Sequence, residues 1–265
     1  MAFPWGALLT TTLVFLVAFS LPNVHAAENN TNKYNKIGQL RKHRPAFAPT
    51  GWKKAQATFY DGDSKSFGGA CGYDDVVKEG YGLDTIAVSS VLFKDGLSCG
   101  SCYEIKCTDS SKGCKTRKSP VLVTATNACH GCSSEHLDLA KPAFVKIAEQ
   151  KAGMVPILYR RVGCKKKGGI RFTITGNPHF NIVSVGNVGG AGDVTQVQVK
   201  GDKKIKHWTN LKRSWGQKWQ TDVMLQGETL SFKVRTGDGR HSISPKVAPS
   251  GWKFGQTFEG KNFVN

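Results

Sequence analysis

A carboxyl group at Asp138 stands directly before a segment with a helical pattern. A carboxyl that faces a groove can protonate or hydrogen-bond a sugar oxygen. Its spacing alone favours a structural use, in which an acid at a helix N-terminus accepts hydrogen bonds from free backbone N–H groups. Thr58 and Tyr60 share one face of a predicted strand over residues 57–60. They can join Asp138 only if the fold brings that strand close to it.

Hydrolysis of a glycosidic bond normally needs two carboxyl groups, about 5–5.5 Å or about 6.5–9.5 Å apart according to mechanism. No local motif distinguishes a second member among the candidates, which are Asp61, Asp63, Asp74, Asp75, Glu104 and Asp109. The seven histidines show no metal-ligand spacing, and no Gly-x-Ser-x-Gly motif occurs. The sequence therefore predicts no metal site and no cofactor, and it does not support nucleophilic or metal-assisted chemistry.

Aromatic residues of the second half are candidates for stacking on sugar rings. Trp215 and Trp219 are four residues apart, so they would share a face if both lay on one strand. An apolar sugar face against an indole excludes water over a large area. The alternative is a place in the core, and we expect Trp252 or one of this pair to be buried. Phe180 is a further aromatic candidate.

The composition is strongly basic, with 37 Lys plus Arg against 19 Asp plus Glu and a net charge of +18. Residues 1–26 carry no charged side chain and end in Val-His-Ala after an apolar run, which predicts a signal peptide. A basic, unpatterned stretch over residues 27–50 predicts a flexible arm, with Asn29 in a glycan-acceptor triplet. The chain is thus expected to be exported and to span no membrane, so an acidic extracellular polymer suits its charge better than nucleic acid.

Eight cysteines divide the chain, since none occurs beyond Cys164. This boundary predicts a cystine-bearing domain over residues 51–164, a solvated linker over 165–169 and a cysteine-free domain over 170–263. Two C-x-x-C pairs are compatible with a zinc ribbon, but 26 residues separate them, which is longer than the usual spacing of about 15–20. An even count in an exported chain favours disulfides, and the count alone leaves their pairing open.

Hydrophobic periodicity indicates an all-β protein. Short strand-like runs and one helix over residues 142–153 suggest a closed barrel in the first domain. Alternating runs over 170–175 and 230–234, with recurring Gly and Asp turns, suggest a two-sheet sandwich in the second. The glycine run at 189–193 is expected to join two strands and to hold no nucleotide.

Many strings along residues 52–263 resemble those of plant expansins, and of the α-expansin branch in particular. The matching strings are Ala57-Thr58-Phe59-Tyr60, Gly68-Gly69-Ala70-Cys71-Gly72-Tyr73, Cys99-Gly100-Ser101-Cys102-Tyr103-Glu104-Ile105-Lys106-Cys107, Val123-Thr124-Ala125-Thr126-Asn127, His136-Leu137-Asp138-Leu139, Asn187-Val188-Gly189-Gly190-Ala191-Gly192-Asp193, Trp215-Gly216-Gln217 and Gly255-Gln256-Thr257-Phe258.

This resemblance implies a six-stranded double-psi β-barrel, like that of family-45 endoglucanases, followed by an immunoglobulin-like carbohydrate-binding β-sandwich. It implies a secreted, monomeric cell wall protein that loosens contacts of cellulose and xyloglucan without hydrolysis, most readily at acidic pH. Pectin is an acidic wall partner suited to the charge. The implied disulfides are Cys71–Cys99, Cys102–Cys164, Cys107–Cys114 and Cys129–Cys132.

By position, the resemblance implies that Thr58, Tyr60 and Asp138 line the barrel groove. It assigns Phe180 and Trp215 to polysaccharide binding, with Trp219 as a third member. Two features depart from the family pattern: Leu137 replaces the usual Phe, and only two residues separate Cys129 from Cys132, where α-expansins usually have a longer insertion.

Two other functions remain as alternatives. The first is an endo-β-glucanase that uses Asp138 as general acid and Asp61 or Asp63 as base, which requires a second carboxyl within about 10 Å across the groove. The second is a pure polysaccharide-binding or defence module in which the barrel is only a scaffold.

Overall fold

The computed structural model describes residue 1, residues 47–115 and residues 119–264. The predicted signal peptide lies outside these residues, apart from Met1. So do Asn29 and most of the predicted arm. Residues 47–50, at the end of the predicted arm, lie against the first domain. The backbone N–H of Thr50 donates to Arg161 O at 2.9 Å, and the Arg161 guanidinium lies 4.8 Å from the Phe47 ring centroid.

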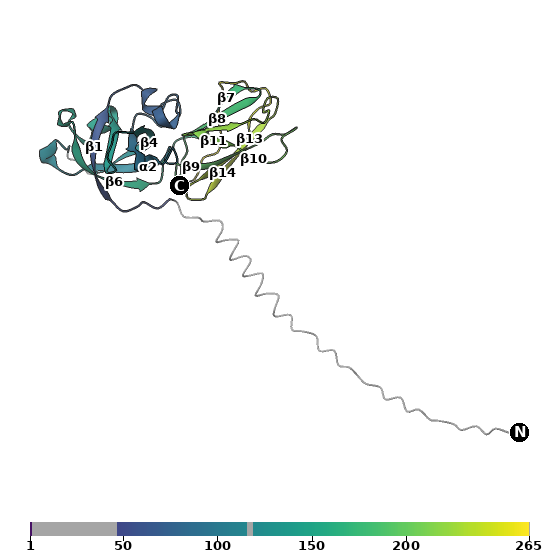
Figure 1. Ribbon diagram of the computed structural model, residues 1–265, viewed down its shortest axis with the longest axis horizontal. Coiled ribbons are helices and arrows are strands. Elements are labelled where there is room, and N and C mark those ends of the chain that lie inside the picture. The colour runs from purple at the N-terminus through teal and green to yellow at the C-terminus, as the bar shows by residue number, and fades with distance from the viewer. Residues whose placement is uncertain (2–46, 116–118, 265) are drawn as a thin grey trace. The chain divides into compact units, whose positions relative to one another are not determined.

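Six strands form a closed barrel in the order β1-β5-β2-β4-β3-β6 (Figure 1). The pairs β1–β5 and β2–β4 are parallel, and β1 and β6 close the barrel as antiparallel neighbours. The strands are β1 Lys53–Tyr60, β2 Thr85–Ser89, β3 Cys102–Cys107, β4 Val121–Cys129, β5 His136–Ala140 and β6 Val155–Val162.

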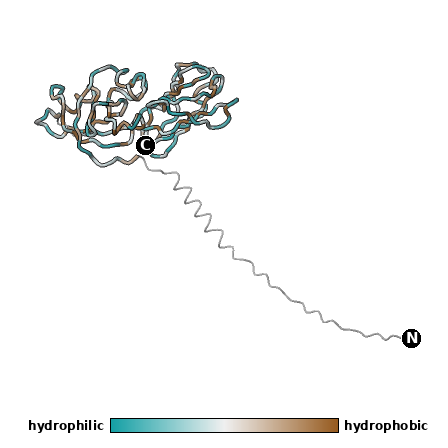
Figure 2. Tube along the Cα trace, viewed as in Figure 1, coloured by the Kyte–Doolittle hydropathy of each residue, from teal (hydrophilic) through white to brown (hydrophobic). Residues whose placement is uncertain are grey.

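Period-two alternation fills the barrel with aliphatic side chains. Figure 2 shows hydrophobic and hydrophilic positions following one another along the chain trace. Ala57 on β1 and Leu137 and Leu139 on β5 have no exposed surface, whereas Thr58 and Asp138 beside them are only half-buried. Because neighbouring residues on a strand point to opposite sides, Thr58 and Asp138 face the outside of the barrel.

Short helices cover the barrel. They are η1 Ser66–Cys71, α2 Ser90–Phe93, η2 Ser110–Lys112, α3 Lys141–Ile147 and η3 Gln150–Ala152. Pro142 lies in the first turn of α3, as predicted, but the helix ends six residues before Gly153. Ala148 is extended, and Gly153 with φ of 65° ends η3 instead. None of the helices in the described ranges has the length and apolarity needed to cross a bilayer.

Four disulfides lie in or next to the barrel, and no cysteine of the described chain is free. The pairs are the four that the resemblance implies: Cys71–Cys99, Cys102–Cys164, Cys107–Cys114 and Cys129–Cys132. The cysteine that ends the first domain is thereby bonded to the start of β3.

A sandwich of two antiparallel sheets follows, with strand orders β10-β9-β13-β14 and β11-β12-β8-β7-β15. The predicted order of barrel then sandwich is confirmed. Phe172 and Phe232, stacked with ring centroids 4.5 Å apart, lie in the core between the sheets. The strands are β7 Arg171–Asn177, β8 Phe180–Gly186, β9 Val194–Lys200, β10 Thr209–Asn210, β11 Lys212–Trp215, β12 Lys218–Thr221, β13 Leu230–Thr236, β14 His241–Ala248 and β15 Thr257–Glu259.

The prediction of a solvated linker over 165–169 is wrong for Lys166. Its Nζ donates to Thr124 Oγ1 at 2.9 Å and lies 4.4 Å from the Tyr81 ring centroid. Burial lowers the pKa of Lys166 to about 7. Lys165 and Lys167 on either side are exposed, as expected. The lysine run therefore fastens the connection to the barrel through its middle residue.

Candidate functional site

Thr58 and Asp138 lie directly opposite each other on the parallel strands β1 and β5. The Thr58 hydroxyl donates to Asp138 Oδ1 at 2.6 Å. His136 Nε2 lies 2.7 Å from the same hydroxyl oxygen. Because the hydroxyl proton is used by the carboxylate, the ring nitrogen donates to Thr58 Oγ1 when it carries a proton. The three side chains form one hydrogen-bonded cluster on the outer face of the barrel.

The interpretation of Asp138 as a helix-capping acid is wrong. Asp138 lies inside β5, and α3 begins only at Lys141. The N-cap residue of α3 is Ala140, and no side chain caps the helix. The carboxyl group is thus held by a partner 80 residues away along the chain rather than by the helix that follows it.

Partial burial raises the pKa of the Asp138 carboxyl, while the Thr58 hydrogen bond and the His136 ring act in the opposite direction. The net shift is upward, so the carboxyl takes up a proton at a higher pH than an exposed aspartate does. A protonated carboxyl donates a hydrogen bond, whereas a carboxylate only accepts. Acidification therefore changes what Asp138 can offer to a sugar oxygen.

Tyr60 lies two residues beyond Thr58 on the same side of β1, but its ring is half-buried. It packs edge-on against Phe67 of η1 with ring centroids 5.4 Å apart. Burial raises its pKa to about 12. Tyr60 therefore serves as a wall beside the cluster and stays protonated at acidic and neutral pH.

The acids considered as second carboxylates are bonded to other groups. Asp61 Oδ2 forms an ion pair with Lys141 Nζ at 2.7 Å. Asp63 Oδ1 accepts hydrogen bonds from the backbone N–H groups of Lys65 and Ser66 and from the Ser66 hydroxyl. These bonds lower the pKa of both aspartates. Asp63 therefore holds its own turn together, and Asp61 connects the end of β1 to the start of α3.

Three further candidates are bonded in the same way. Glu104 Oε2 receives Arg160 Nε at 2.7 Å and Nη2 at 2.6 Å. Asp74 forms an ion pair with Lys218, and Asp75 accepts a hydrogen bond from the Ser64 hydroxyl. The sixth, Asp109, donates its backbone N–H to Cys114 Sγ at 3.2 Å.

His136 is the member of the cluster that sequence reasoning missed. The histidines were considered only for metal-ligand spacing, which they do not show. His136 and Asp138 are two residues apart in an alternating run, so on a strand they must share a face. That period was available in the sequence once the run is read as a strand and not as the approach to a helix.

Phe180 and Trp215 lie on the outer face of the five-stranded sheet, where 40% and 48% of their surfaces are exposed. Trp215 pairs with Lys218, which pairs with Ser184, and residues paired in register share a face. Phe180 lies four residues before Ser184 on β8, an even number, so its side chain points to the same face of the sheet. Four residues along one strand and two strands across correspond to a separation of about 16 Å.

The prediction that Trp219 joins this face is wrong. Trp219 is 3% exposed and belongs to the sandwich core, like Trp252 at 4%. The chain reverses at Gly216 and Gln217 between β11 and β12, so Trp215 and Trp219 are not on one strand. The Trp219 ring instead lies 4.3 Å from the Arg213 guanidinium, and its Nε1 donates to Gln217 Oε1 at 3.4 Å.

Trp215 also lies over the barrel. A Cβ added to Gly72, at the end of η1, would be 3.0 Å from Trp215 Cη2. Gly72 has φ of 75°, a conformation that favours glycine. Beside it, Lys218 Nζ reaches Asp74 Oδ1 at 3.1 Å. The aromatic face of the sandwich therefore continues onto the η1 segment, which packs on β4 of the barrel.

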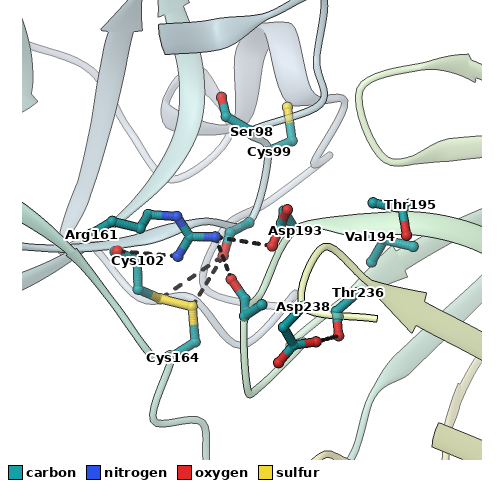
Figure 3. A network of polar contacts seen from close by, with 12 residues as sticks. Ser98, Cys99, Cys102, Arg161, Cys164, Asp193, Val194, Thr195, Thr236 and Asp238 are labelled. Atoms are coloured by element: carbon teal, nitrogen blue, oxygen red, sulfur yellow. Dashed lines mark hydrogen bonds and ion pairs between the residues drawn. A yellow bond between two sulfur atoms is a disulfide. The ribbon is translucent and has the colours of Figure 1, made fainter. Parts of the chain in front are cut away.

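Arg161 joins the two domains from β6 (Figure 3). Its Nη2 donates to Asp193 Oδ1 at 2.9 Å and to Ala191 O at 2.6 Å, while Nη1 donates to Cys102 O at 3.3 Å. The Cys164 N–H donates to Gly190 O at 2.7 Å nearby. A half-buried arginine with this many acceptors favours one arrangement of barrel and sandwich.

Comparison with known proteins gives consistent matches over both domains. The family model for the expansin C-terminal domain matches residues 170–249, and a lytic transglycolase model of the double-psi barrel class matches residues 85–159. Expansin-A32 of Oryza sativa subsp. japonica is 53% identical over 85% of this chain and 89% of that protein. Expansin-A22 of Arabidopsis thaliana is 46% identical over 80% of this chain and 79% of its own length.

Two solved structures share the fold. The apo Clavibacter michiganensis expansin superposes with a TM-score of 0.65 at 23% identity, covering 80% of this chain and 97% of its own. A mutant of that protein in complex with cellohexaose superposes with a TM-score of 0.62 at 22% identity, covering 79% and 96%. The prediction of a double-psi barrel followed by an immunoglobulin-like sandwich is confirmed.

Proposed function

The chain belongs to the expansin family, and we propose that it is a secreted protein that loosens plant cell walls without hydrolysing their polysaccharides. In this proposal it binds cellulose and xyloglucan and weakens the non-covalent contacts between them, most effectively at acidic pH. The observation that carries the proposal is the Thr58–Asp138–His136 cluster on the outer face of the barrel.

The surroundings of Asp138 support a binding role rather than a hydrolytic one. Hydrolysis requires a second carboxyl to activate water or attack the sugar while the first protonates the leaving oxygen. Asp61 and Asp63 were the acids proposed for that task; Asp61 is paired with Lys141 at the start of α3, and Asp63 is bonded to Ser66 in its own turn. A carboxyl beside a hydroxyl can compete with one glucan chain for the hydrogen bonds of another.

The raised pKa of Asp138 supports the acidic preference. Its protonated form can donate to a sugar oxygen that lacks a proton of its own, which the ionised form cannot do. Because the shift is upward, this donor is present below the raised pKa and is lost as the pH rises through it.

The aromatic face supports a long, neutral glucan as ligand. Phe180 and Trp215 are exposed on one sheet about 16 Å apart, a separation that a polymer spans but a single sugar does not. A bacterial expansin of the same fold was crystallised with cellohexaose. Continuation of this face over Gly72 supports one glucan path along both domains.

The experiment combines two measurements on one preparation. Heat-inactivated wall strips are held under constant load, and extension is recorded at acidic and at neutral pH. The same protein is incubated with cellulose and xyloglucan, and reducing ends are counted. We expect extension at acidic pH with no release of reducing ends. Steady release of reducing sugar would instead support the endoglucanase.

Asp138→Asn tests the role of the carboxyl. The amide keeps the size of the side chain but cannot take up and release a proton, so we expect extension to be lost. Asp61→Asn is the control, because it removes an exposed ion pair that is screened by solvent and should leave extension intact. Full extension by Asp138→Asn, together with loss of cellulose binding in Trp215→Ala, would favour the pure binding module.

A further inference from the structure

The outer face of the four-stranded sheet, opposite to the aromatic face, is rich in cations. Phe232 and Val234 on β13 are fully buried, so Lys233 and Arg235 between and beyond them point outward. Lys233 pairs with Gln198 on β9, and Ser231 on the same side pairs with Lys200. The neighbours across β14 are Ile243 and His241.

Lysines from the adjoining turns extend this cationic face. A cavity of about 530 Å³ is lined by Lys200, Lys206 and Lys246 together with Trp208 and Ile243. A second hollow of about 210 Å³ is lined by residues that include Lys233, Arg235 and His241. Lys233 Nζ lies 5.7 Å from the Trp208 ring centroid, so an indole lies beside the row of charges.

The positive charge of this face is not neutralised locally. None of the ion pairs within the described ranges uses the five cations Lys200, Lys206, Lys233, Arg235 and Lys246. The acid among the lining residues is Asp202, whose Oδ1 accepts the backbone N–H of Thr229 at 2.9 Å. The half-buried amides Gln196 and Gln198 both donate to Asn210 Oδ1.

We propose that this cationic face binds an acidic polysaccharide, a polyuronate whose carboxylates recur along the chain. Lys233 and Arg235 are two residues apart on one strand, which corresponds to about 7 Å, and the next strand lies about 4.8 Å away. A polymer with a carboxylate on each sugar can meet several such cations in succession. Trp208 offers a flat apolar surface on which one sugar ring can stack.

The choice of polyuronate over nucleic acid rests on the proposed wall function, but the face itself is separate from the glucan path. The aromatic face lies on the five-stranded sheet, and the cationic face lies on the other sheet of the sandwich (Figure 1). One molecule would then hold a neutral glucan and an acidic polymer on opposite sides at the same time.

The test measures binding of the full chain to polygalacturonate beads and to microcrystalline cellulose, at low and at high salt. Lys233→Gln/Arg235→Gln should weaken polygalacturonate binding about tenfold at low salt and make its salt dependence shallower, because fewer counterions are released. Cellulose binding should not change. Fully methyl-esterified polymer should bind neither protein.

Lys112→Gln/Lys151→Gln is the matched control, since it removes the same charge from exposed positions on the barrel. Equal loss in this control would overturn the proposal, because the attraction would then belong to net charge alone. Unchanged binding in Lys233→Gln/Arg235→Gln would also overturn it. So would wild-type protein that binds a DNA duplex more tightly than polygalacturonate at the same salt.

Failure of polyuronate binding can be distinguished from failure of wall loosening. Trp208→Ala should weaken polygalacturonate binding even at high salt, since stacking is not screened, while wall extension by the same variant reports on loosening. Loss of extension in wild-type protein with intact polygalacturonate binding would refute loosening and leave the cationic face standing.

Discussion

Glu79 is buried where the barrel meets the sandwich, and its replacement by glutamine tests how pH acts on this contact. Glu79 is 7% exposed, and a Cβ added to Gly186 of β8 would collide with its Oε2. That oxygen has no hydrogen-bond partner among the residues of the structure that are described. The carboxyl therefore loses its water when the two domains come together and gains little in return.

Burial raises the pKa of Glu79 to about 7, and the charge of Asp74 adds to the effect while Lys218 and Arg171 oppose it. The ordinary value is 4.5, so between pH 4.5 and about 7 the folded chain keeps a proton that the unfolded chain has released. The free energy of unfolding must then fall as the pH rises through this window. A shift of this size corresponds to about 3 kcal/mol in total.

Glu79→Gln has the size of the protonated side chain and never carries the charge. We expect equal stability of variant and wild type near pH 4.5 and a gain of up to about 3 kcal/mol for the variant above pH 7, or roughly 6–12 °C in Tm. Urea and thermal unfolding over a pH series measure both. Glu149→Gln, at an exposed ion pair, is the control and should change little. Stability curves of Glu79→Gln that run parallel to wild type from acid to neutral pH would refute the reasoning.

Three other substitutions follow from the same geometry. Lys166 loses its proton at a lower pH in the folded chain than in the unfolded chain, so the free energy of unfolding of wild type should rise by a few kcal/mol between pH 7 and 10.5. Lys166→Met should abolish this rise, which urea unfolding over a pH series measures. Gly72→Ala should weaken cellulose binding, because the added Cβ displaces Trp215. The control is Gly82→Ala, at φ of 71° with open space around it, which carries the same backbone strain of about 1–2 kcal/mol and should leave binding unchanged. Equal cellulose binding by the two variants would contradict the contact between Gly72 and Trp215. Trp215→Ala should lower cellulose affinity about tenfold at unchanged Tm, and Trp219→Ala should instead cost about 3–5 kcal/mol of stability in an unfolding titration.

Periodicity was sufficient to predict strands within β1, β7 and β13, since each of them buries one face, and the cysteine boundary separated barrel from sandwich; it did not predict β5. It could not predict the partner of Asp138. Its local neighbours, including Pro142 at the start of a helix, suggested a cap, whereas the hydrogen bond that holds it comes from Thr58 across a parallel strand pair. Parallel pairing joins residues far apart in the chain, and no local spacing encodes which strand will be adjacent.

The prediction that Trp215 and Trp219 share one face was wrong for a different reason. A separation of four residues puts two side chains on one face only if no turn intervenes. Gly216, with φ of 50°, makes the turn that sends Trp215 outward and Trp219 into the core. The glycine was visible in the sequence, and weighing it as a turn residue would have separated the two indoles. The disulfide pairs came from resemblance alone, because the cysteine count leaves the pairing open.

The position of Trp215 depends on the barrel, although the residue belongs to the sandwich. The turn that follows it is held by Gln217, whose backbone N–H donates to Cys71 O at 2.9 Å and whose Nε2 donates to Cys99 O at 3.0 Å. Cys71 and Cys99 are joined by a disulfide, so both acceptors belong to one rigid part of the barrel. A glucan that stacks on Trp215 therefore bears on the barrel as directly as on the sandwich. In the proposed function, a pull on that glucan would reach both domains through the two hydrogen bonds of Gln217.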